Sequence, residues 1–425
     1  MNILLIGSGG REHAFAYKLT QSARCEKLFV MPGNAGTSLL AVNVSIDPLN
    51  FALVGKFCTD NDVQLIIIGP EEPLVKGMRN YFLADSTLKK IPFVGPDEIG
   101  AQLEGSKDFS KAFMTKYAIP TAAYKTFTIE NLSEGIEYTK QHTLPIVLKA
   151  DGLAAGKGVL ICESHDEAMR ELEAMIQNQK FGKASSKVVV EAFLRGIELS
   201  VFVVTDGNNY KLLPSAKDYK RIGEGDTGLN TGGMGAISPV PFANEAFLQK
   251  VEQRIVIPTI EGLKNEGITY VGFLFIGLMN LDGEPSVIEY NCRMGDPETE
   301  VVLPRIESDL VEMMHATATG KLNEYRLLIS PKTAATVMLV SEGYPGDYAK
   351  GKIITGFESA SGSFIFHGGT TKDLVGNYIT DGGRVLAITS LGDSIKDAVQ
   401  LSMQNAERIH FDGKNYRKDI GYEFL

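Results

Sequence analysis

Short apolar runs alternate with helix-like or loop segments over roughly the first hundred residues. The runs cover residues 2–6, 27–31, 42–46, 64–68 and 92–94. They are rich in leucine and β-branched residues, and glycine or proline closes each one. This alternation predicts a parallel sheet with helices on its faces. The glycine-containing loops 7–10, 33–36 and 69–71 would then meet in one crevice at the carboxyl ends of the strands.

The pattern changes after Gly105. Residues 106–117 have the spacing of an amphipathic helix, with Ser106 as its cap and Pro120 shortly after its end. Strand-like runs and helical patterns then alternate in a small α+β unit. We expect its strands at 124–127, 146–149, 158–162 and 187–191, and its helices at 130–142 and 166–178.

Longer runs between residues 198 and 291 predict antiparallel strands, with turns at Asp206-Gly207-Asn208 and Asp282-Gly283-Glu284. From about residue 331 the chain has short strands, many glycines and a late helix at 394–409. The predicted fold is therefore a multidomain α/β and α+β structure with a Rossmann-like parallel sheet first and a small β-rich domain last. A length of 425 residues suits this division. We expect domains at 1–104, 105–330 and 331–425, with a small subdomain at about 123–190.

Composition narrows the class of protein. The hydrophobic fraction of 44% is enough for several cores, and the net charge of -10 disfavours nucleic acid or a membrane surface as partner. The four cysteines are far apart, which fits neither a zinc site nor a disulfide framework and suits a reducing compartment. No apolar stretch approaches the length of about 20 residues that a membrane helix needs. These features predict a soluble cytoplasmic protein.

A glycine-rich loop with a lysine at each end joins two predicted strands. It reads Lys149-Ala-Asp-Gly-Leu-Ala-Ala-Gly-Lys157-Gly158. Small residues let backbone N–H groups approach phosphate oxygens. It is not a Walker A loop, because glycine follows Lys157 and a strand follows the loop. A hairpin turn with solvated lysines remains the alternative.

Two acid-containing segments lie close together further along. Glu289 and Asn291 share one face of a predicted strand, where a carboxylate and an amide oxygen suit Mg²⁺ bound mainly through nucleotide phosphates. An ordinary polar strand face is the alternative.

Asp296-Pro297 predicts a helix start, and Arg293 beside it suits an anion or carboxylate. Simple helix capping would explain Asp296 without requiring Arg293.

Two further segments are candidates for ligand contact. Residues 218–235 combine charges with a glycine-rich connection, and apolar Met234, Ile237 and Val240 favour an ordered loop that covers a substrate. Residues 188–198 form a strand and an apolar link between Glu191 and Glu198, which suits a purine and its ribose. A plain connection between strands reads the same way.

Taken in order, these motifs resemble the phosphoribosylamine–glycine ligase family, ATP-grasp enzymes of purine biosynthesis. The resemblance rests on the first glycine turn, Gln102-Leu-Glu-Gly-Ser-Lys107, the 149–158 loop, Asn230-Thr-Gly-Gly-Met-Gly and Asn291-Cys-Arg-Met-Gly-Asp-Pro-Glu-Thr, and it extends over the whole chain. It implies an ATP-grasp core of two α+β subdomains between the outer domains. It also implies ATP, Mg²⁺ or Mn²⁺, glycine and 5-phosphoribosylamine as ligands, in a monomer or a weakly associating dimer.

The resemblance also implies site residues by motif. The ATP site would comprise Lys107, Lys149, Gly152, Gly156, Lys157, Gly158, Glu191, Phe193, Leu194 and Glu198. The substrates would contact Gly9, Gly10, Arg11, Glu12, Asn34, Gly36, Pro70, Glu71, Asn230, Gly232, Gly233 and Arg293. Asp218, Arg293 and Asp296 would be catalytic, and Glu289 and Asn291 would bind the metal. The chain departs from residues common in the family at Lys217, Met294 and Glu300.

Three other functions are compatible with parts of the pattern. Another ATP-grasp ligase, such as a bicarbonate-using carboxylase, would share the ATP motifs, and a non-catalytic nucleotide sensor could keep the fold. An NAD-dependent oxidoreductase would need an acid after the second strand, where this chain has Met31-Pro32-Gly33-Asn34. It would also need glycine where the first turn has Glu12, whose bulk we expect to prevent close packing of helix on strand.

Overall fold

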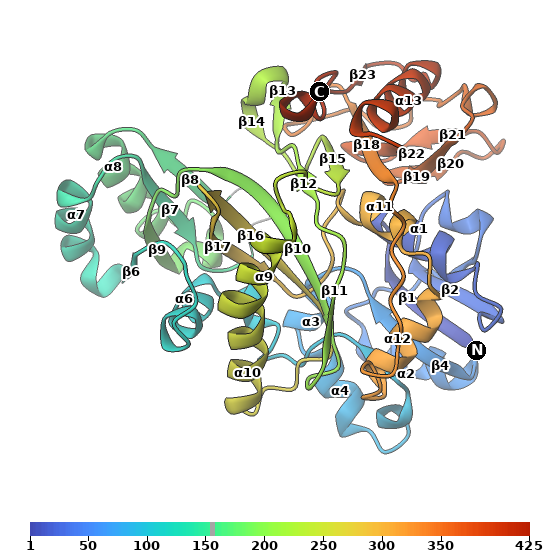
Figure 1. Cartoon of the computed structure of the whole chain (residues 1–425), viewed down its shortest axis with the longest axis horizontal. Helices are drawn as coiled ribbons and strands as arrows, with labels where there is room; N and C mark the ends of the chain where they lie inside the picture. The colour runs from blue at the N-terminus through green and yellow to red at the C-terminus, as the bar shows by residue number, and fades with distance from the viewer. Residues whose placement is uncertain (154–157) are drawn as a thin grey trace.

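The structure is a computed structural model that describes residues 1–153 and 158–425. Figure 1 shows the N-terminal part in blue and the C-terminal part in red, side by side, with a small α+β unit in teal projecting from the opposite end. The middle of the chain lies between them. The expected multidomain α/β and α+β architecture is confirmed.

The N-terminal part is a five-stranded parallel sheet in the order β3-β2-β1-β4-β5. Its strands are β1 (Asn2–Gly7), β2 (Lys27–Pro32), β3 (Val42–Asn43), β4 (Val63–Ile68) and β5 (Phe93–Val94). Its helices are α1 (Gly10–Leu19), α2 (Phe51–Asp60), α3 (Glu72–Val75), α4 (Met78–Ala84) and α5 (Gln102–Gly105). The strand order reverses at β1, so the loops that follow β1 and β4 flank the crevice typical of such sheets.

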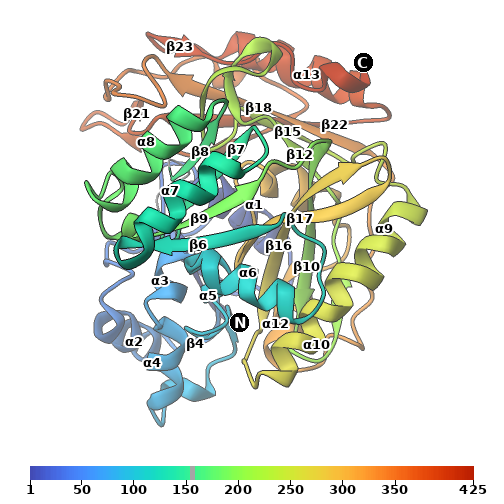
Figure 2. The ribbon, with the colours of Figure 1, turned by 90° about the vertical axis from the view of Figure 1, so that its left-hand side faces the viewer.

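The small α+β unit follows α6 (Lys107–Lys116), whose N-terminus is capped by Ser106 as predicted. Its antiparallel sheet runs β6-β9-β7-β8, formed by β6 (Tyr124–Thr128), β7 (Ile146–Ala150), β8 (Val159–Cys162) and β9 (Lys187–Ala192). Helices α7 (Leu132–Gln141) and α8 (His165–Ile176) cover one face (Figure 2). Lys149 of β7, Val159 and Ile161 of β8 and Glu191 of β9 line the large cavity described below.

A second four-stranded antiparallel sheet, β11-β10-β16-β17, occupies the middle of the molecule. It contains β10 (Ile197–Thr205), β11 (Tyr210–Leu212), β16 (Gly272–Leu281) and β17 (Glu284–Asn291). Both turns predicted from sequence join neighbouring strands of it. The prediction of strands between 198 and 291 was wrong in one part, because α9 (Glu245–Val251), a π-helical segment (Glu252–Val256) and α10 (Ile257–Asn265) form a continuous helical segment there.

Alternate residues of β10 pack into two different cores. Leu199 and Val201 belong to a core shared with β1 and β4 and with α9 and α10, whereas Phe202 and Val204 face a core shared with α1. Side chains on the two faces of a strand alternate, so both faces of this sheet are buried. The N-terminal and middle parts are therefore fixed to each other by apolar packing.

The C-terminal sheet takes strands from both sides of the predicted boundary at residue 331. Its order is β12-β15-β18-β22-β19, and β23 (Lys414–Asn415) pairs with β18. The strands are β12 (Lys217–Asp218), β15 (Gly235–Ser238), β18 (Thr333–Ser341), β19 (Ser363–His367) and β22 (Arg384–Gly392). Helix α13 (Ile395–Arg408) packs on this sheet. Helix α12 (Leu310–Ala318) comes between β15 and β18 in the chain. Two small hairpins, β13 (Arg221–Gly223) with β14 (Thr227–Asn230) and β20 (Thr370–Lys372) with β21 (Tyr378–Thr380), project from it.

The connection 218–235 is ordered, as predicted: β13 and β14 pair within it, Met234 is fully buried, and so is Ile237 just after it. One local prediction changes. The predicted helix start at Asp296-Pro297 was wrong: α11 (Thr299–Val302) is a single turn whose N-cap is Glu298. In the described ranges 1–153 and 158–425, no helix has both the length and the apolar character to cross a membrane.

Candidate active site

A cavity of about 940 Å³ lies where the N-terminal part, the small α+β unit, the middle sheet and the C-terminal part meet. Loops of the N-terminal sheet, strands β7, β9 and β17, and the β12–β14 segment contribute to its walls. The structure brings together in it many residues predicted from sequence: Arg11, Pro70, Glu71, Lys107, Lys149, Gly158, Glu191, Glu198, Asp218, Asn230, Gly232, Glu289, Asn291, Arg293 and Asp296.

Glu191 organises the lysines on one wall. Its Oε2 lies 2.9 Å from Nζ of Lys111 and 3.1 Å from Nζ of Lys149, and all three side chains are buried. Lys149 also donates to the carbonyl of Ile288 at 3.1 Å. Burial lowers the pKa of Lys111 to about 8, and the positive charge of Lys149 lowers it further. The negative charge of Glu191 acts in the opposite direction but does not outweigh them. The second oxygen of Glu191 has no hydrogen-bond partner within the described residues.

Lys111 was missed by sequence reasoning. It lies within the predicted helix 106–117, whose buried face also carries Phe113 and Met114. The sequence feature that could have identified Lys111 is a lysine on the buried face of a helix, because a buried lysine requires a partner.

Glu289 and Asn291 form a candidate metal site at the end of β17. The pairing of β16 with β17 shifts register between Val287 and Glu289. Burial alone would raise the pKa of Glu289, but the charges of nearby lysines, with Lys220 and Lys149 first, outweigh it and leave the pKa lowered. The Nδ2 of buried Asn291 has no hydrogen-bond partner within ranges 1–153 and 158–425.

These two residues fit a magnesium ion held largely by other oxygen donors. An ionised carboxylate and an amide are the kind of ligand that Mg²⁺ takes, and phosphate oxygens and water usually complete its shell. No cluster of three or more His, Cys, Asp or Glu side chains able to hold a metal occurs in the described part of the chain. The described residues therefore do not form a metal site that consists of protein ligands alone.

A second charged group lies beside the metal candidates. Lys220 Nζ lies 2.8 Å from Glu198 Oε2, and the charges of Glu198, Asp218 and Glu289 raise the pKa of Lys220 well above its usual value despite burial. Burial, and then the charge of Glu198, raises the pKa of Asp218. Lys220 lies in the candidate segment 218–235 but was not itself assigned a role.

Arg293 lies between two carboxylates from the N-terminal part and its linker. Its Nε is 3.2 Å from Glu71 and its Nη2 is 2.6 Å from Glu104 of α5. Burial opposes the charge of Arg293, but Glu104 and Glu71 outweigh it, so the pKa of Arg293 is raised. Glu104 also accepts from the backbone N–H of Cys292, which fixes the end of β17. Glu104 lies inside a motif that was quoted from sequence but was not assigned a role.

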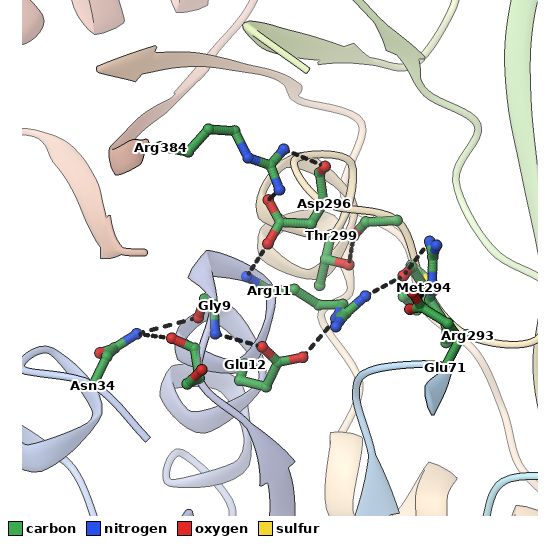
Figure 3. A network of polar contacts seen from close by, with 12 residues as sticks. Gly9, Arg11, Glu12, Asn34, Glu71, Arg293, Met294, Asp296, Thr299 and Arg384 are labelled. Atoms are coloured by element: carbon green, nitrogen blue, oxygen red, sulfur yellow. Dashed lines mark hydrogen bonds and ion pairs between the residues drawn. The ribbon is translucent and has the colours of Figure 1, made fainter. Parts of the chain in front are cut away.

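Asp296 connects the N-terminal loop to the C-terminal sheet (Figure 3). Its Oδ1 lies 2.9 Å from Nη2 of Arg384, and its Oδ2 accepts from the backbone N–H of Arg11 at 3.3 Å. Arg384 also donates to the carbonyls of Gly232 and Asp296, each at 2.6 Å. Burial would raise the pKa of Asp296, but Arg384 and Arg11 leave it lowered. Arg384 starts β22 and was missed, because nothing in its local sequence distinguishes it from a surface arginine.

The first glycine turn packs differently from expectation. Glu12 is buried, accepts from the N–H of Gly9 at 2.6 Å and from Nε of Arg11 at 2.5 Å, and does not line either cavity. A Cβ on Gly7 or on Gly69 would collide with Glu12. The expectation that Glu12 prevents close packing was therefore wrong: two glycines from neighbouring strands make room for it.

A smaller cavity of about 270 Å³ adjoins the first and is bordered by Gly9, Gly10, Asn34, Asp296 and Arg384. The amide of Asn34 donates to the carbonyls of Ser8, Gly9 and His367, and its Oδ1 accepts from the N–H groups of Gly36 and Thr37. Because these bonds occupy its side chain, Asn34 shapes the loop.

Several predicted residues are outside the two cavity linings among the described residues. Phe193 is exposed and Leu194 half-buried after β9, while Gly36, Gly152 and Gly233 pack against His13, Ala184 and Pro297. Gly156 and Lys157 lie outside the described residues. The large cavity is lined by several cations, among them Lys107, Lys149, Lys220 and Arg293, which suit a polyanion and a small carboxylate held close together.

Comparisons with known proteins identify relatives over the full chain. Family models match the phosphoribosylglycinamide synthetase N domain at residues 1–104, its ATP-grasp (A) domain at 105–299 and its C domain at 334–423. The chain is 46% identical to a phosphoribosylamine–glycine ligase of Pasteurella multocida, with 99% of the chain and 98% of the relative covered.

Solved structures agree with this assignment. A crystal structure of phosphoribosylamine–glycine ligase from Thermotoga maritima matches with a TM-score of 0.85 at 35% identity, covering 99% of this chain and all of that one. The biotin carboxylase domain of a Hydrogenobacter thermophilus 2-oxoglutarate carboxylase, solved with MgADP and bicarbonate, matches with a TM-score of 0.71 at 18% identity over 97% of this chain and 91% of that one. The latter likeness is one of fold.

Proposed function

Because the chain belongs to the phosphoribosylglycinamide synthetase family, we propose that its two adjoining cavities hold ATP, glycine and 5-phosphoribosylamine during one ligation reaction. The activity is that of a C–N ligase of purine biosynthesis. Glycine and 5-phosphoribosylamine are joined with ATP to give glycinamide ribonucleotide, ADP and phosphate. The residue roles below are the proposal.

The observation that supports these roles is the charge arrangement of the large cavity. The charges of Lys220, Lys149 and Lys107 act on Glu289, Arg293 pairs with Glu71, and all of these residues line the same cavity. Phosphoryl transfer requires positioning and charge neutralisation rather than a protein nucleophile. A triphosphate along the lysines and a carboxylate near Arg293 would meet in this cavity.

The nucleotide roles follow from position. Lys107 and Lys149 would contact phosphate oxygens, and Glu191 and Glu198 would border the nucleoside, near the link at 193–194. The loop 152–158 would cover the phosphates, with Gly158 at its edge. A bound Mg²⁺ or Mn²⁺, held by Glu289 and Asn291, would neutralise phosphate charge.

Glycine would lie on the side of Arg293. The guanidinium group would orient the glycine carboxylate so that its oxygen attacks the γ-phosphorus of ATP and gives glycyl phosphate and ADP. Asp218 and the segment from Asn230 to Gly233 would border the amino end of glycine. Because an acyl phosphate hydrolyses readily, the covering segments would also exclude water.

The amine of 5-phosphoribosylamine would then attack the carbonyl carbon of glycyl phosphate and release phosphate. We place this substrate at Gly9, Gly10 and Arg11, between the smaller cavity and the loop at Pro70-Glu71. Asp296 and Arg384 fix that corner of the site. Glu12, Asn34 and Gly36 would stabilise the backbone of the glycine turn at this substrate site.

The wider setting is also a proposal. The domains would be 1–104, 105–330 with a lid subdomain at about 123–190, and 331–425. The protein would act in the cytoplasm on small molecules, without nucleic acid or membrane, as a monomer or a weakly associating dimer.

The test is ADP formation measured directly by chromatography, because common coupling enzymes need Mg²⁺ themselves. Glycine, the metal and 5-phosphoribosylamine, formed in the assay from ribose 5-phosphate and ammonia, are omitted in turn. We expect each omission to abolish ADP release. Release that depends on bicarbonate instead of glycine would support the carboxylase alternative, and nucleotide binding without turnover would support the sensor.

A matched pair of variants tests the metal site. Glu289→Ala should abolish turnover, whereas Glu284→Ala should not, since Glu284 lies on the same strand but pairs with Lys250 at the surface. Unchanged turnover in Glu289→Ala would contradict the proposed metal role.

A further inference from the structure

Glu300 is a buried acid that the reaction scheme does not use. Its side chain is fully buried in α11, and neither of its oxygens has a hydrogen-bond donor within the described residues. A Cβ on Gly10 would collide with its Oε1, so the carboxyl group lies directly against the first glycine turn. The carboxyl group of Asp296 lies at the same turn: a Cβ on Gly9 would come within 2.9 Å of its Oδ2, and its charge acts on Glu300.

The nearby cations are occupied by other groups. Arg384 binds the carboxylate and carbonyl of Asp296 and the carbonyl of Gly232. The guanidinium of Arg11 binds Glu12 and the carbonyl of Met294.

The remaining charged neighbour of Glu300 is Glu298, which is also an acid. No neighbour in the described part of the chain therefore supplies a donor to Glu300. Two adjacent carboxyl groups in a buried place cannot both be ionised without a large penalty. Asp296 has Arg384 and the N–H of Arg11 as partners, so its carboxylate is the one that stays charged.

We propose that Glu300 is a positioning residue that works as a neutral carboxylic acid, donating its O–H to the carboxylate of Asp296. This bond would hold Asp296 at the position where it reaches both the N-terminal loop and Arg384. The inference rests on the proposed placement of 5-phosphoribosylamine at that corner. The direction of the pKa shifts agrees: burial, and then the charge of Asp296, raises the pKa of Glu300 well above its usual value, while the pKa of Asp296 is lowered.

The arrangement predicts a specific alkaline defect. Above its own pKa, Glu300 would carry a second negative charge beside Asp296, and the shared bond would be lost. The affinity for 5-phosphoribosylamine should then fall, because the turn at Gly10 and the carboxylate of Asp296 both border its cavity. The affinity for ATP should not follow this change, because the residues proposed for the nucleotide, Lys107, Lys149 and Glu191, are not among the charged neighbours of Glu300.

The experiment compares wild type with Glu300→Gln and Glu300→Ala from about pH 6.5 to about pH 9.5. The amide of Gln keeps a donor and cannot ionise, whereas Ala has neither property. At neutral pH we expect Glu300→Ala to raise the KM for 5-phosphoribosylamine but not for ATP, and Glu300→Gln to restore it. Above the pKa of Glu300, kcat/KM of wild type should fall relative to Glu300→Gln by about tenfold for each pH unit. Taking the ratio of the two enzymes cancels the titration of the substrates.

Infrared spectroscopy supplies a readout that does not depend on activity. At about pH 8 wild type should show the carbonyl stretch of a protonated carboxylic acid that is absent from Glu300→Gln. Absence of that band, or equal behaviour of the Gln and Ala variants at all pH values, would overturn the proposal. If ADP release by wild type proved independent of glycine, the proposed function would fail, yet the infrared band would still report the neutral acid.

Discussion

His13 and His367 form a neutral pair that joins the N-terminal and C-terminal parts, and this pair should make their association sensitive to acid. His13 lies in the first turn of α1 and His367 ends β19, and both are buried. The backbone N–H of His367 donates to Nδ1 of His13 at 2.8 Å. The carbonyl of His367 in turn accepts from the amide of Asn34 at 2.7 Å, so the pair supports the loop of the smaller cavity.

Both rings resist protonation in the folded protein. Burial, with a further contribution from His367, lowers the pKa of His13 from its ordinary 6.5 to about 3. Burial, with a further contribution from Lys372, lowers the pKa of His367 to about 4. Protonation of His13 would also remove the lone pair that accepts from His367, and would place a positive charge near the N-terminus of a helix.

The sign of the effect follows from where each state binds protons. Between about pH 6.5 and the folded pKa values, the unfolded chain takes up protons that the folded chain refuses, so stability falls as the pH falls. For His13, lowering the pH from about 7.5 to about 5 should remove about 2 kcal/mol from the unfolding free energy. His367 adds about 2 kcal/mol more over the same range.

The assay is urea unfolding at both pH values, followed through the first transition because multidomain chains can unfold in steps. In His13→Asn the side-chain oxygen can still accept from His367 but cannot titrate. Its loss of stability on acidification should therefore be smaller than that of wild type by about 2 kcal/mol. His410→Asn is the matched control, because His410 is exposed and should leave the pH dependence unchanged. Equal losses in wild type and His13→Asn, or an NMR titration of His13 near its ordinary pKa, would refute the reasoning.

Three further predictions concern the large cavity. Lys111→Met should raise the KM for ATP by about tenfold or more, because it leaves a buried carboxylate with one partner fewer, whereas Lys116→Met on the exposed side of the same helix should not. Arg384→Ala should raise the KM for 5-phosphoribosylamine by at least about tenfold, and lysine should not rescue it, because a point charge cannot replace the several bonds of the guanidinium. A double-mutant cycle with Lys217→Met and Glu423→Gln, measured by thermal unfolding, should give a coupling of about 1 kcal/mol for this 3.0 Å pair, and additive effects would contradict it.

Much of the fold was predictable because local signals agreed with the final packing. The runs at 2–6 and 64–68 are apolar from their second residue onward, as strands buried on both faces must be, and they lie in β1 and β4. The helical segment from α9 to α10 was missed for a physical reason. Its middle reads Ile255-Val-Ile-Pro258, a β-branched run with proline that favours a strand or a break, and tertiary packing overrides that preference.

The site was predictable only where a motif carried it. Glu289, Asn291 and Arg293 lie in one short segment, so their proximity follows from the sequence itself. Arg384 was not predictable, because its partner Asp296 lies 88 residues away in the chain and only the sheet topology brings them together. Glu12 was misjudged because part of the space it needs is made by Gly69, which follows another strand and lies far from Glu12 in the sequence.

The charged pairs of this site come from different parts of the molecule, and that distribution indicates what they do. Glu191 of β9 pairs with Lys111 of α6, and Arg293 pairs with Glu71 of the N-terminal loop. Removing both members of a buried pair in favour of apolar residues is often neutral or stabilising, so such pairs are weak evidence for stability. Each pair instead fixes the position of one charge relative to another across an interface between parts of the fold. A reaction among three separately bound ligands needs that accuracy, because its rate depends on how well the reacting groups are held in place.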